Sequence, residues 1–220
     1  MRRFWTIALS IGLTVFPALV GASPLYKDAA VRMLDGTIMV QKADGSPATA
    51  LQTGSVVEQG DAVTVFDKSW VILKSRKGDQ IGFYGDTLAS FDQLNKEGND
   101  RDIRILLKHG TVMLKATDSS SQQSYFEIDT GSVVTSVGDS ELIISYDPVK
   151  DHLEIRHIRG RISVFDKAGE HHFKTQDAIW DWDKGVLVQT GDPDLMDQLD
   201  IVNFNRFFNG DKLLEPSSPY

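Results

Sequence analysis

The sequence predicts an all-β fold with a short helix near its C-terminus. From residue 30 to about residue 189, apolar and polar residues alternate in short runs, the pattern of half-buried strands. Valine, isoleucine, threonine and aromatic residues fill these runs, and glycine, aspartate, asparagine and serine separate them. A glycine-led motif also recurs along the chain. These observations favour a twisted two-layer sandwich or roll, or a solenoid-like stack of short strands.

The first 22 residues have the features of a secretory signal peptide. Arg2 and Arg3 precede the apolar run Phe4–Phe16, and small residues follow it. This order of charge, short apolar segment and small side chains is typical of an exported precursor. We therefore expect cleavage between Ala22 and Ser23.

An uncleaved membrane anchor is the alternative for this segment. Its uninterrupted apolar run is shorter than the ~20 residues that a spanning helix needs, which favours cleavage. No later segment is long and apolar enough, so we expect no transmembrane segment after the signal is removed. The chain has no cysteine to carry a lipid anchor. We therefore expect a periplasmic or secreted protein.

The acidic composition excludes some partners. The net charge is −8, so phosphate groups of nucleic acids and anionic membranes would be repelled. Without cysteine the exported domain forms no disulfides, and burial of an apolar core must stabilise it.

The predicted β-domain covers residues 23–190. Two segments show the alternation clearly, with one set of apolar residues on each presumed inner face: Ile103, Ile105 and Leu107 in the first, Leu153 and Ile155 in the second. In the stretch Leu51–Leu73, Gly54 and Gly60 mark turns or bulges between short strands. Asp61 is placed to hydrogen-bond its own turn, and Trp70 opens the next strand.

The glycine-led motif is found at "LDGTIMV", "KHGTVML" and "IRGRISV", around Gly36, Gly110 and Gly160. Each reads as a strand that starts after a tight turn. The glycines are 74 and then 50 residues apart, which is too uneven for a strict solenoid but compatible with stacked hairpin layers.

Three segments differ from the strand pattern. Residues 92–102 are charged and poor in apolar residues, which predicts a surface loop. Residues 191–210 predict a helix that begins near Asp192 and ends at Gly210. This helix is expected to carry one apolar stripe, and residues 211–220 are expected to be a disordered tail. The stripe comprises Leu195, Leu199, Val202, Phe204, Phe207 and Phe208.

The order of these elements resembles the FecR-like extracytoplasmic domain of bacteria. The matching pieces are "LQTGSVVEQGDAV", "SWVILKS" with "DQIGF", "LLKHGTVML", "YFEIDTGSVVTSVGDSELIIS" and "HIRGRISVF", which together span residues 31–170. The chain departs from the family pattern in two places. Thr130 precedes glycine rather than proline, and the segment Val137–Leu142 lacks the family's arginine. The resemblance implies a divergent member.

The resemblance implies a mostly β module that binds outside the cytoplasm. The family's best-known members carry an anti-sigma segment before a membrane helix. In this chain the apolar segment starts at Phe4, so we expect no such segment and no anti-sigma role.

No motif predicts a catalytic, cofactor-binding or metal-binding residue, and we expect a protein that is not an enzyme. His171 and His172 are neighbours on a presumed strand and would point to opposite faces, and His109 sits in a presumed turn without a ligand pattern. Trp180 and Trp182 share one presumed strand face, where they fill a core or stack on sugar rings.

The sequence thus favours a non-enzymatic binding or scaffold module of the cell envelope that contacts another protein. The first alternative is a cell-wall or glycan-binding module that uses Trp180 and Trp182. The second is a hydrolase without a familiar motif.

The signal-peptide interpretation predicts a mature protein that starts at Ser23. Replacing Ala22→Phe puts a bulky side chain where the peptidase needs a small one, so the product should keep its first 22 residues. Intact-mass measurement of the exported protein, for wild type and for Ala22→Phe, shows whether residues 1–22 have been removed. Wild-type protein recovered with Met1 would contradict the interpretation.

Overall fold

The computed structural model describes residues 28–75, 78–94, 102–116, 125–150, 152–166, 169–173, 178–183, 186–189 and 198–211. Within these ranges there are 16 strands, joined in one mixed sheet, and a single helix, α1 (Gln198–Asn209). The predicted all-β fold with a short C-terminal helix is therefore confirmed. The signal segment with Ala22 and Ser23, and the tail from residue 212, lie outside the described residues.

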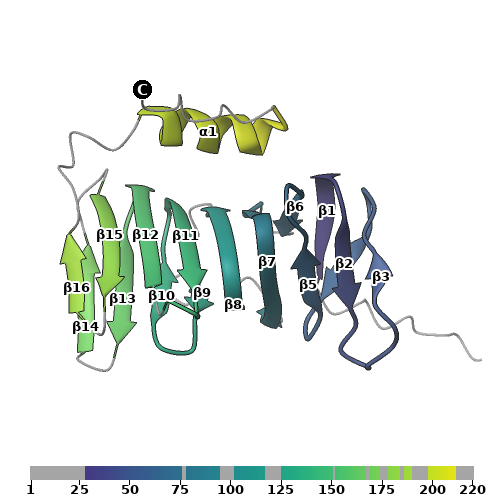
Figure 1. The fold of residues 1–220 in the computed structure, drawn as a ribbon, viewed down its shortest axis with the longest axis horizontal. Helices are drawn as coiled ribbons and strands as arrows, with labels where there is room; N and C mark the ends of the chain where they lie inside the picture. The colour runs from purple at the N-terminus through teal and green to yellow at the C-terminus, as the bar shows by residue number, and fades with distance from the viewer. Residues whose placement is uncertain are drawn as a thin grey trace, which may run out of the picture.

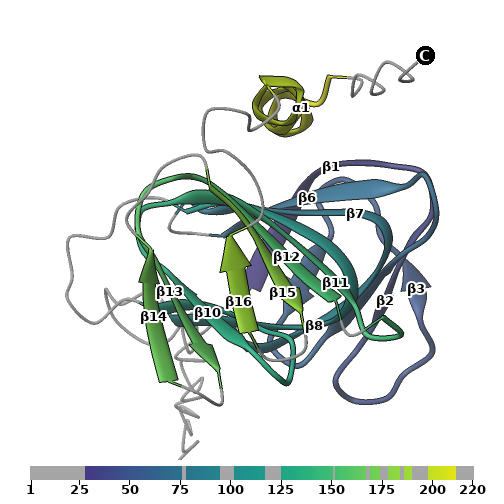
Figure 2. The same cartoon turned by 60° about the vertical axis from the view of Figure 1, so that its left-hand side comes forward.

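The sheet folds into two layers because two long strands, β7 (Gln80–Leu94) and β8 (Asp102–Lys115), pass through both (Figure 2). The helix-side layer runs in the order β4 (Val56–Glu58), β1 (Asp28–Asp35), β6 (Trp70–Ser75), the first half of β7, the second half of β8, β11 (Glu141–Asp147), β12 (His152–Arg159), β15 (Ala178–Asp183) and β16 (Val186–Gln189).

The far layer runs in the order β3 (Thr49–Ala50), β2 (Ile38–Gln41), β5 (Ala62–Val65), the second half of β7, the first half of β8, β9 (Tyr125–Asp129), β10 (Val134–Val137), β13 (Ile162–Asp166) and β14 (Gly169–Phe173). The β8–β9 pair is parallel, and the other described pairs are antiparallel. The chain fills the sandwich in sequence order, from the purple end to the green end in Figure 1.

The core lies between the two layers. Ile103, Ile105 and Leu107 on β8 are fully buried. Leu153 and Ile155 on β12 are at most 2% exposed. These residues belong to one continuous apolar cluster that draws on both layers. The alternation in the sequence therefore identified the inner face of these strands correctly.

The three glycine-led motifs mark the corners where the chain passes between the layers. Gly36 lies between β1 and β2, Gly110 lies within β8, and Gly160 lies between β12 and β13. Beside each glycine, a second segment of the chain also changes layer, and it presents a buried hydroxyl: Ser69, Thr87 and Ser140, respectively. The predicted repeat is thus a repeat of corners rather than of complete hairpins.

Each corner is held by the same hydrogen bond. The amide after the glycine donates to the neighbouring hydroxyl; the donors and acceptors are Thr37 to Ser69 (2.9 Å), Thr111 to Thr87 (2.9 Å) and Arg161 to Ser140 (2.7 Å). At Gly110 the backbone has φ +99°, and a Cβ atom would overlap the Thr87 hydroxyl. Glycine is needed there because no larger residue lets the two crossing strands approach so closely.

The helix α1 packs on the outer face of the helix-side layer, opposite the core (Figure 1). Phe204, Phe207 and Phe208 are buried there, as predicted for the apolar stripe. Val202 is 42% exposed and does not belong to the stripe, because it lies on the side of the helix away from these phenylalanines. No helix within the described ranges has the length and apolar content needed to span a membrane.

The structure also tests the local predictions about turns, strand starts and the charged loop. Gly60 is followed by β5 and Trp70 opens β6, as expected, and the Asp61 carboxylate accepts a hydrogen bond from the Glu58 amide at 2.8 Å. The predicted loop from residue 92 begins too early, because β7 continues to Leu94, which is fully buried. A single apolar residue among charged ones was too weak a signal to extend the strand.

The corner hydrogen bonds predict a stability loss from an isosteric change. Thr87→Val keeps the shape of the side chain but leaves the Thr111 amide and the Tyr84 carbonyl without the buried hydroxyl that they contact. The free energy of unfolding should fall by about 1–3 kcal/mol in urea titrations. The control Thr64→Val, at a partly exposed position of β5, should change it by under about 0.5 kcal/mol. Equal losses would argue against the corner bond.

Candidate functional site

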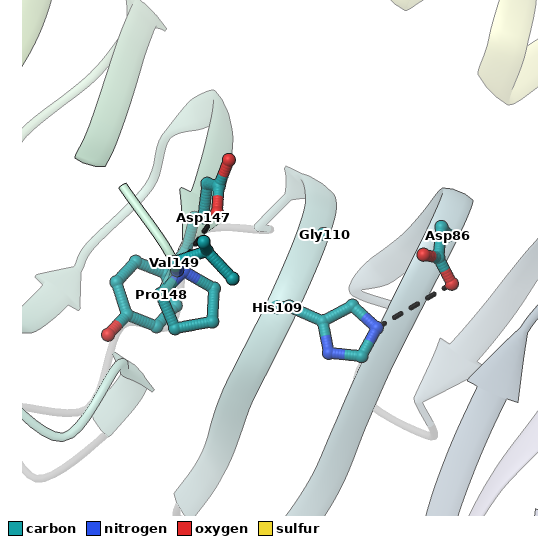
Figure 3. A pocket seen from close by; sticks show the side chains of 7 residues that line it. Asp86, His109, Gly110, Asp147, Pro148 and Val149 are labelled. Atoms are coloured by element: carbon teal, nitrogen blue, oxygen red, sulfur yellow. Dashed lines mark hydrogen bonds and ion pairs between the residues drawn. The ribbon is translucent and has the colours of Figure 1, made fainter. Parts of the chain in front are cut away.

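An open cleft of 440 Å³ lies beside the corner between β7 and β8. Its walls come from β7, from β8, and from the turn that joins β11 to β12 (Figure 3). The lining residues are Asp86, His109, Gly110, Tyr146, Asp147, Pro148 and Val149.

The wall formed by the β11–β12 turn is held by its own aspartate. The Asp147 carboxylate accepts hydrogen bonds from the amides of Val149 (3.0 Å) and Lys150 (3.3 Å), and it pairs with the Lys150 ammonium at 3.1 Å. These contacts, led by the Lys150 side chain, hold the pKa of Asp147 below its usual value. Asp147 therefore stays ionised and shapes the turn.

The other wall carries a histidine–aspartate pair. His109 Nε2 lies 3.6 Å from Asp86 Oδ1, and Figure 3 shows the imidazole directed toward this carboxylate. The prediction that His109 lies in a turn is wrong, because β8 continues through it and bends only at Gly110.

The rim of the cleft exposes an apolar side chain. Val149 is 93% exposed, the largest value among the exposed large apolar residues of the described ranges. Tyr146, three residues earlier in the chain, is partly buried and packs against the core. The turn thus combines a base fixed by the Asp147 carboxylate with an exposed apolar side chain at its tip.

The cleft brings together two carboxylates and a histidine, the combination on which a hydrolase interpretation would depend. Asp86 is 81% exposed at its side chain, so the pair stands in high dielectric where its electrostatic effect is weak. Asp147 is engaged by its turn. The lining residues include no serine, threonine or cysteine that could act as a nucleophile for His109.

The cleft was not predicted from the sequence. Its residues come from three separated segments, around residues 86, 109 and 147, and none of these carries a motif for binding or catalysis. The pairing of β8 with β7 and β11 brings them together at the corner marked by Gly110, which the repeated motif did indicate.

The other residues singled out in the sequence lie elsewhere. On β14, His171 is paired with Val164 and His172 with Ser163; on β15, Trp180 is paired with Ile155 and Trp182 with Leu153. The side chains of these four residues lie outside the described residues, so the glycan-binding role of Trp180 and Trp182 stays a prediction. Among the described residues, no group of three or more histidine, aspartate or glutamate side chains is arranged to hold a metal ion.

Three charged clusters join neighbouring strands or loops. Lys42 pairs with Asp61 (2.7 Å) and Glu58 (3.0 Å), and Arg104 pairs with Asp129 at 2.6 Å. In the third cluster the carboxylate belongs to a strand and is 8% exposed at its side chain. Glu141 on β11 contacts Lys115 on β8 (2.9 Å) and Arg159 on β12 (2.8 Å), so it bridges three adjacent strands.

The pKa of Glu141 reflects two opposed effects. Burial would raise it, but the hydrogen bonds and charges of Arg159 and Lys115 outweigh burial and hold the pKa below its ordinary value of 4.5. The charged groups of these clusters whose pKa values are shifted therefore take part in contacts that hold neighbouring strands or loops together. They are Lys42, Arg104, Glu141 and Arg159.

Comparisons with known proteins show a fold likeness only. No protein-family model and no curated protein sequence matches the chain. Two crystal structures, at 1.65 Å and 2.50 Å resolution, of what is described as a putative anti-sigma factor from Parabacteroides distasonis ATCC 8503 match with a TM-score of 0.50. Sequence identity is 8%, and the match covers 60% of this chain and 59% of that one. About 60% of this chain thus has a fold similar to part of that protein.

The Glu141 cluster predicts a pH-dependent stability. Because its folded-state pKa is lowered, Glu141 stabilises the fold above pH 4.5, and this contribution is lost as the pH falls through the folded-state value. Glu141→Gln should lower the free energy of unfolding by about 1–2 kcal/mol at pH 7, less than for a fully buried pair because Lys115 and Arg159 are partly exposed.

The difference between Glu141→Gln and wild type should become smaller as the pH falls below 4.5, in urea titrations at each pH. The control Glu170→Gln, at an exposed position, should show a much smaller difference at every pH. A Glu141→Gln difference that is the same at pH 3 and pH 7 would contradict the assignment.

Proposed function

We propose that this chain is a divergent FecR-like module of the bacterial cell envelope that binds another protein and performs no chemistry of its own. The observation that carries the proposal is the fold likeness to an anti-sigma-type protein, because it agrees with the resemblance of the sequence pieces between residues 31 and 170. At 8% identity the likeness supports the fold, and the role follows from the site and the sequence.

The described charges support a binding role. Asp61, Glu141 and Arg104 are engaged in contacts between strands or loops, and Asp147 is engaged in its own turn. In the cleft, the exposed tip of Val149 and the exposed carboxylate of Asp86 are directed to solvent. An apolar tip with a polar surround is a common anatomy for a protein contact.

The signal segment supports a location outside the cytoplasm. A periplasmic or secreted protein without disulfides must be stable through its core alone, and the continuous apolar cluster between the two layers meets that need. The acidic net charge favours a protein partner over nucleic acid.

The proposal predicts a specific cross-link in the envelope. With a photo-reactive amino acid in place of Val149, the full precursor expressed in its bacterial host should yield an adduct with an envelope protein, identified by mass spectrometry. The matched control carries the same group in place of Val56, an exposed valine on β4, and should not give that adduct.

Other outcomes separate the proposal from its alternatives. A tagged full chain that recovers an envelope protein without a cross-link at Val149 would move the contact away from the cleft but keep the function. Retention on peptidoglycan with no protein partner would favour the glycan-binding alternative. Release of soluble fragments from peptidoglycan, lost in His109→Ala, would favour the hydrolase and overturn the proposal.

A further inference from the structure

A row of aromatic and polar side chains crosses the outer face of the helix-side layer. Five neighbouring strands, β6, β7, β8, β11 and β12, contribute one residue each, and the ladders place these residues in register. Because the residues come from five separate strands, no local sequence pattern marks them. We call them the transverse row, which comprises in spatial order Trp70, Tyr84, Thr111, Ser145 and Glu154.

The transverse row lies beside α1 rather than beneath it. On four of its strands the residue two positions away lies under the helix; these residues are Ile72, Gly82, Met113 and Ile143. The ring of Phe207 on α1 meets Trp70 and Tyr84 edge-on, with centroid distances of 5.6 Å and 6.4 Å. Figure 1 shows α1 lying across the strands of the layer, which is also the direction of the row. The helix therefore forms a wall along the row.

The aromatic end of the row remains accessible. Tyr84 is 37% exposed in spite of its contact with Phe207, and Trp70 is partly exposed. An accessible aromatic ring on a sheet face offers an apolar surface against which a ligand can pack. This end of the row is therefore an aromatic platform that α1 borders on one side.

The other end of the row presents hydrogen-bonding groups. The hydroxyl oxygens of Thr111 and Ser145 lie 3.0 Å apart, and both residues are partly exposed. A hydroxyl has one donor and two acceptor sites, so one shared bond leaves capacity for a ligand. Beside them, Arg156 Nε donates to the Glu154 carboxylate at 2.6 Å, with these side chains 31% and 24% exposed. Donors and acceptors thus follow the platform along one line.

The composition of the row indicates the class of ligand. Thr111 makes the centre of the row polar, whereas the centre of a protein contact is usually apolar. Glu154 and the net charge of −8 disfavour a ligand rich in phosphate. A sugar ring fits both ends, because its C–H groups pack on an aromatic ring and its hydroxyl groups donate and accept hydrogen bonds.

The length of the row suits a short chain of sugars. Adjacent strands lie about 4.8 Å apart, so the row spans about 19 Å from its first strand to its fifth. A β-linked pyranose chain is extended and advances by close to one strand spacing per sugar. Laid beside α1, such a chain places successive rings over successive strands.

We propose that the transverse row binds an extended, β-linked saccharide chain, with one ring packed on Tyr84 and the following rings hydrogen-bonded to Thr111, Ser145 and Glu154. The site goes beyond the proposed function, because it gives the chain a second ligand of different chemistry. None of its residues lines the cleft, and it lies on strands other than β15, which carries Trp180 and Trp182.

The test is isothermal titration calorimetry of the purified full chain with three sugars. Tetra-N-acetylchitotetraose and cellotetraose are both β-linked, and at least one of them should bind. Maltotetraose, whose α-linkages curve the chain away from a flat face, should bind at least about 10-fold more weakly than the better of the two. The ratio of the first two affinities shows whether N-acetyl groups contribute. Binding of neither β-linked sugar, or equal binding of maltotetraose, would overturn the proposal.

Variants of the row test the assignment of residues. Tyr84→Ala should weaken binding of the better β-linked sugar by about 10-fold, whereas Tyr84→Phe keeps the ring and should bind as wild type. Ser145→Ala removes one hydroxyl and should weaken binding by about 5-fold. The matched control is Phe165→Ala on β13 of the far layer, where the side chain is 38% exposed, and its affinity should be unchanged. Thermal unfolding should show that each variant is folded.

The position of the bound sugar provides a second readout. In amide NMR spectra, the shifts caused by the sugar should concentrate on β6, β7, β8 and β11. Shifts centred on β15 would assign the sugar to Trp180 and Trp182, and shifts centred on the β11–β12 turn would assign it to the cleft; either result would overturn the proposal. Equal affinity of Tyr84→Ala, Ser145→Ala and wild type would do the same. Because no envelope protein is present, the proposed protein contact at Val149 is judged separately by its own cross-link.

Discussion

The architecture depends on one repeated contact, the hydrogen bond from the amide after a corner glycine to a buried hydroxyl on the neighbouring crossing. A strand that leaves one layer for the other must give up its ladder partners at the bend, and a buried amide without a partner is costly. Ser69, Thr87 and Ser140 supply those partners at three successive corners. The absence of a side chain on each glycine lets the two segments come close enough for the bond to form.

The same corners determine where the surface features lie. The bend at Gly110 brings the end of β8 beside Asp86 and opens the cleft next to the β11–β12 turn. On the outer face of the helix-side layer, Gly82 leaves room for Phe207. Small residues therefore serve two purposes in this chain: at the corners they allow the backbone to turn, and under α1 they allow an aromatic ring to approach the sheet.

The sequence predicted the features that depend on local pattern. Period-two alternation identified the inner face at Ile105 and Ile155, and the glycine-led motif marked the corners although it did not reveal their form. The exposed position of Val202 was missed because helix periodicity gives a stripe only roughly, and the contacts with the sheet decide which residues face it. The cleft was missed because it joins segments around residues 86, 109 and 147, and their proximity follows from the long-range pairing of β7, β8 and β11.

Each corner joins parts of the chain that are near in sequence. The three bonds link residues separated by 32, 24 and 21 positions, and the segments that they close follow one another along the chain. The entropy lost on closing loops of this size grows only slowly with length, so the loops between corners can differ in size at little cost. Assembly can then proceed from the amino-terminal end, because each finished bend presents a strand edge with which the next segment can pair.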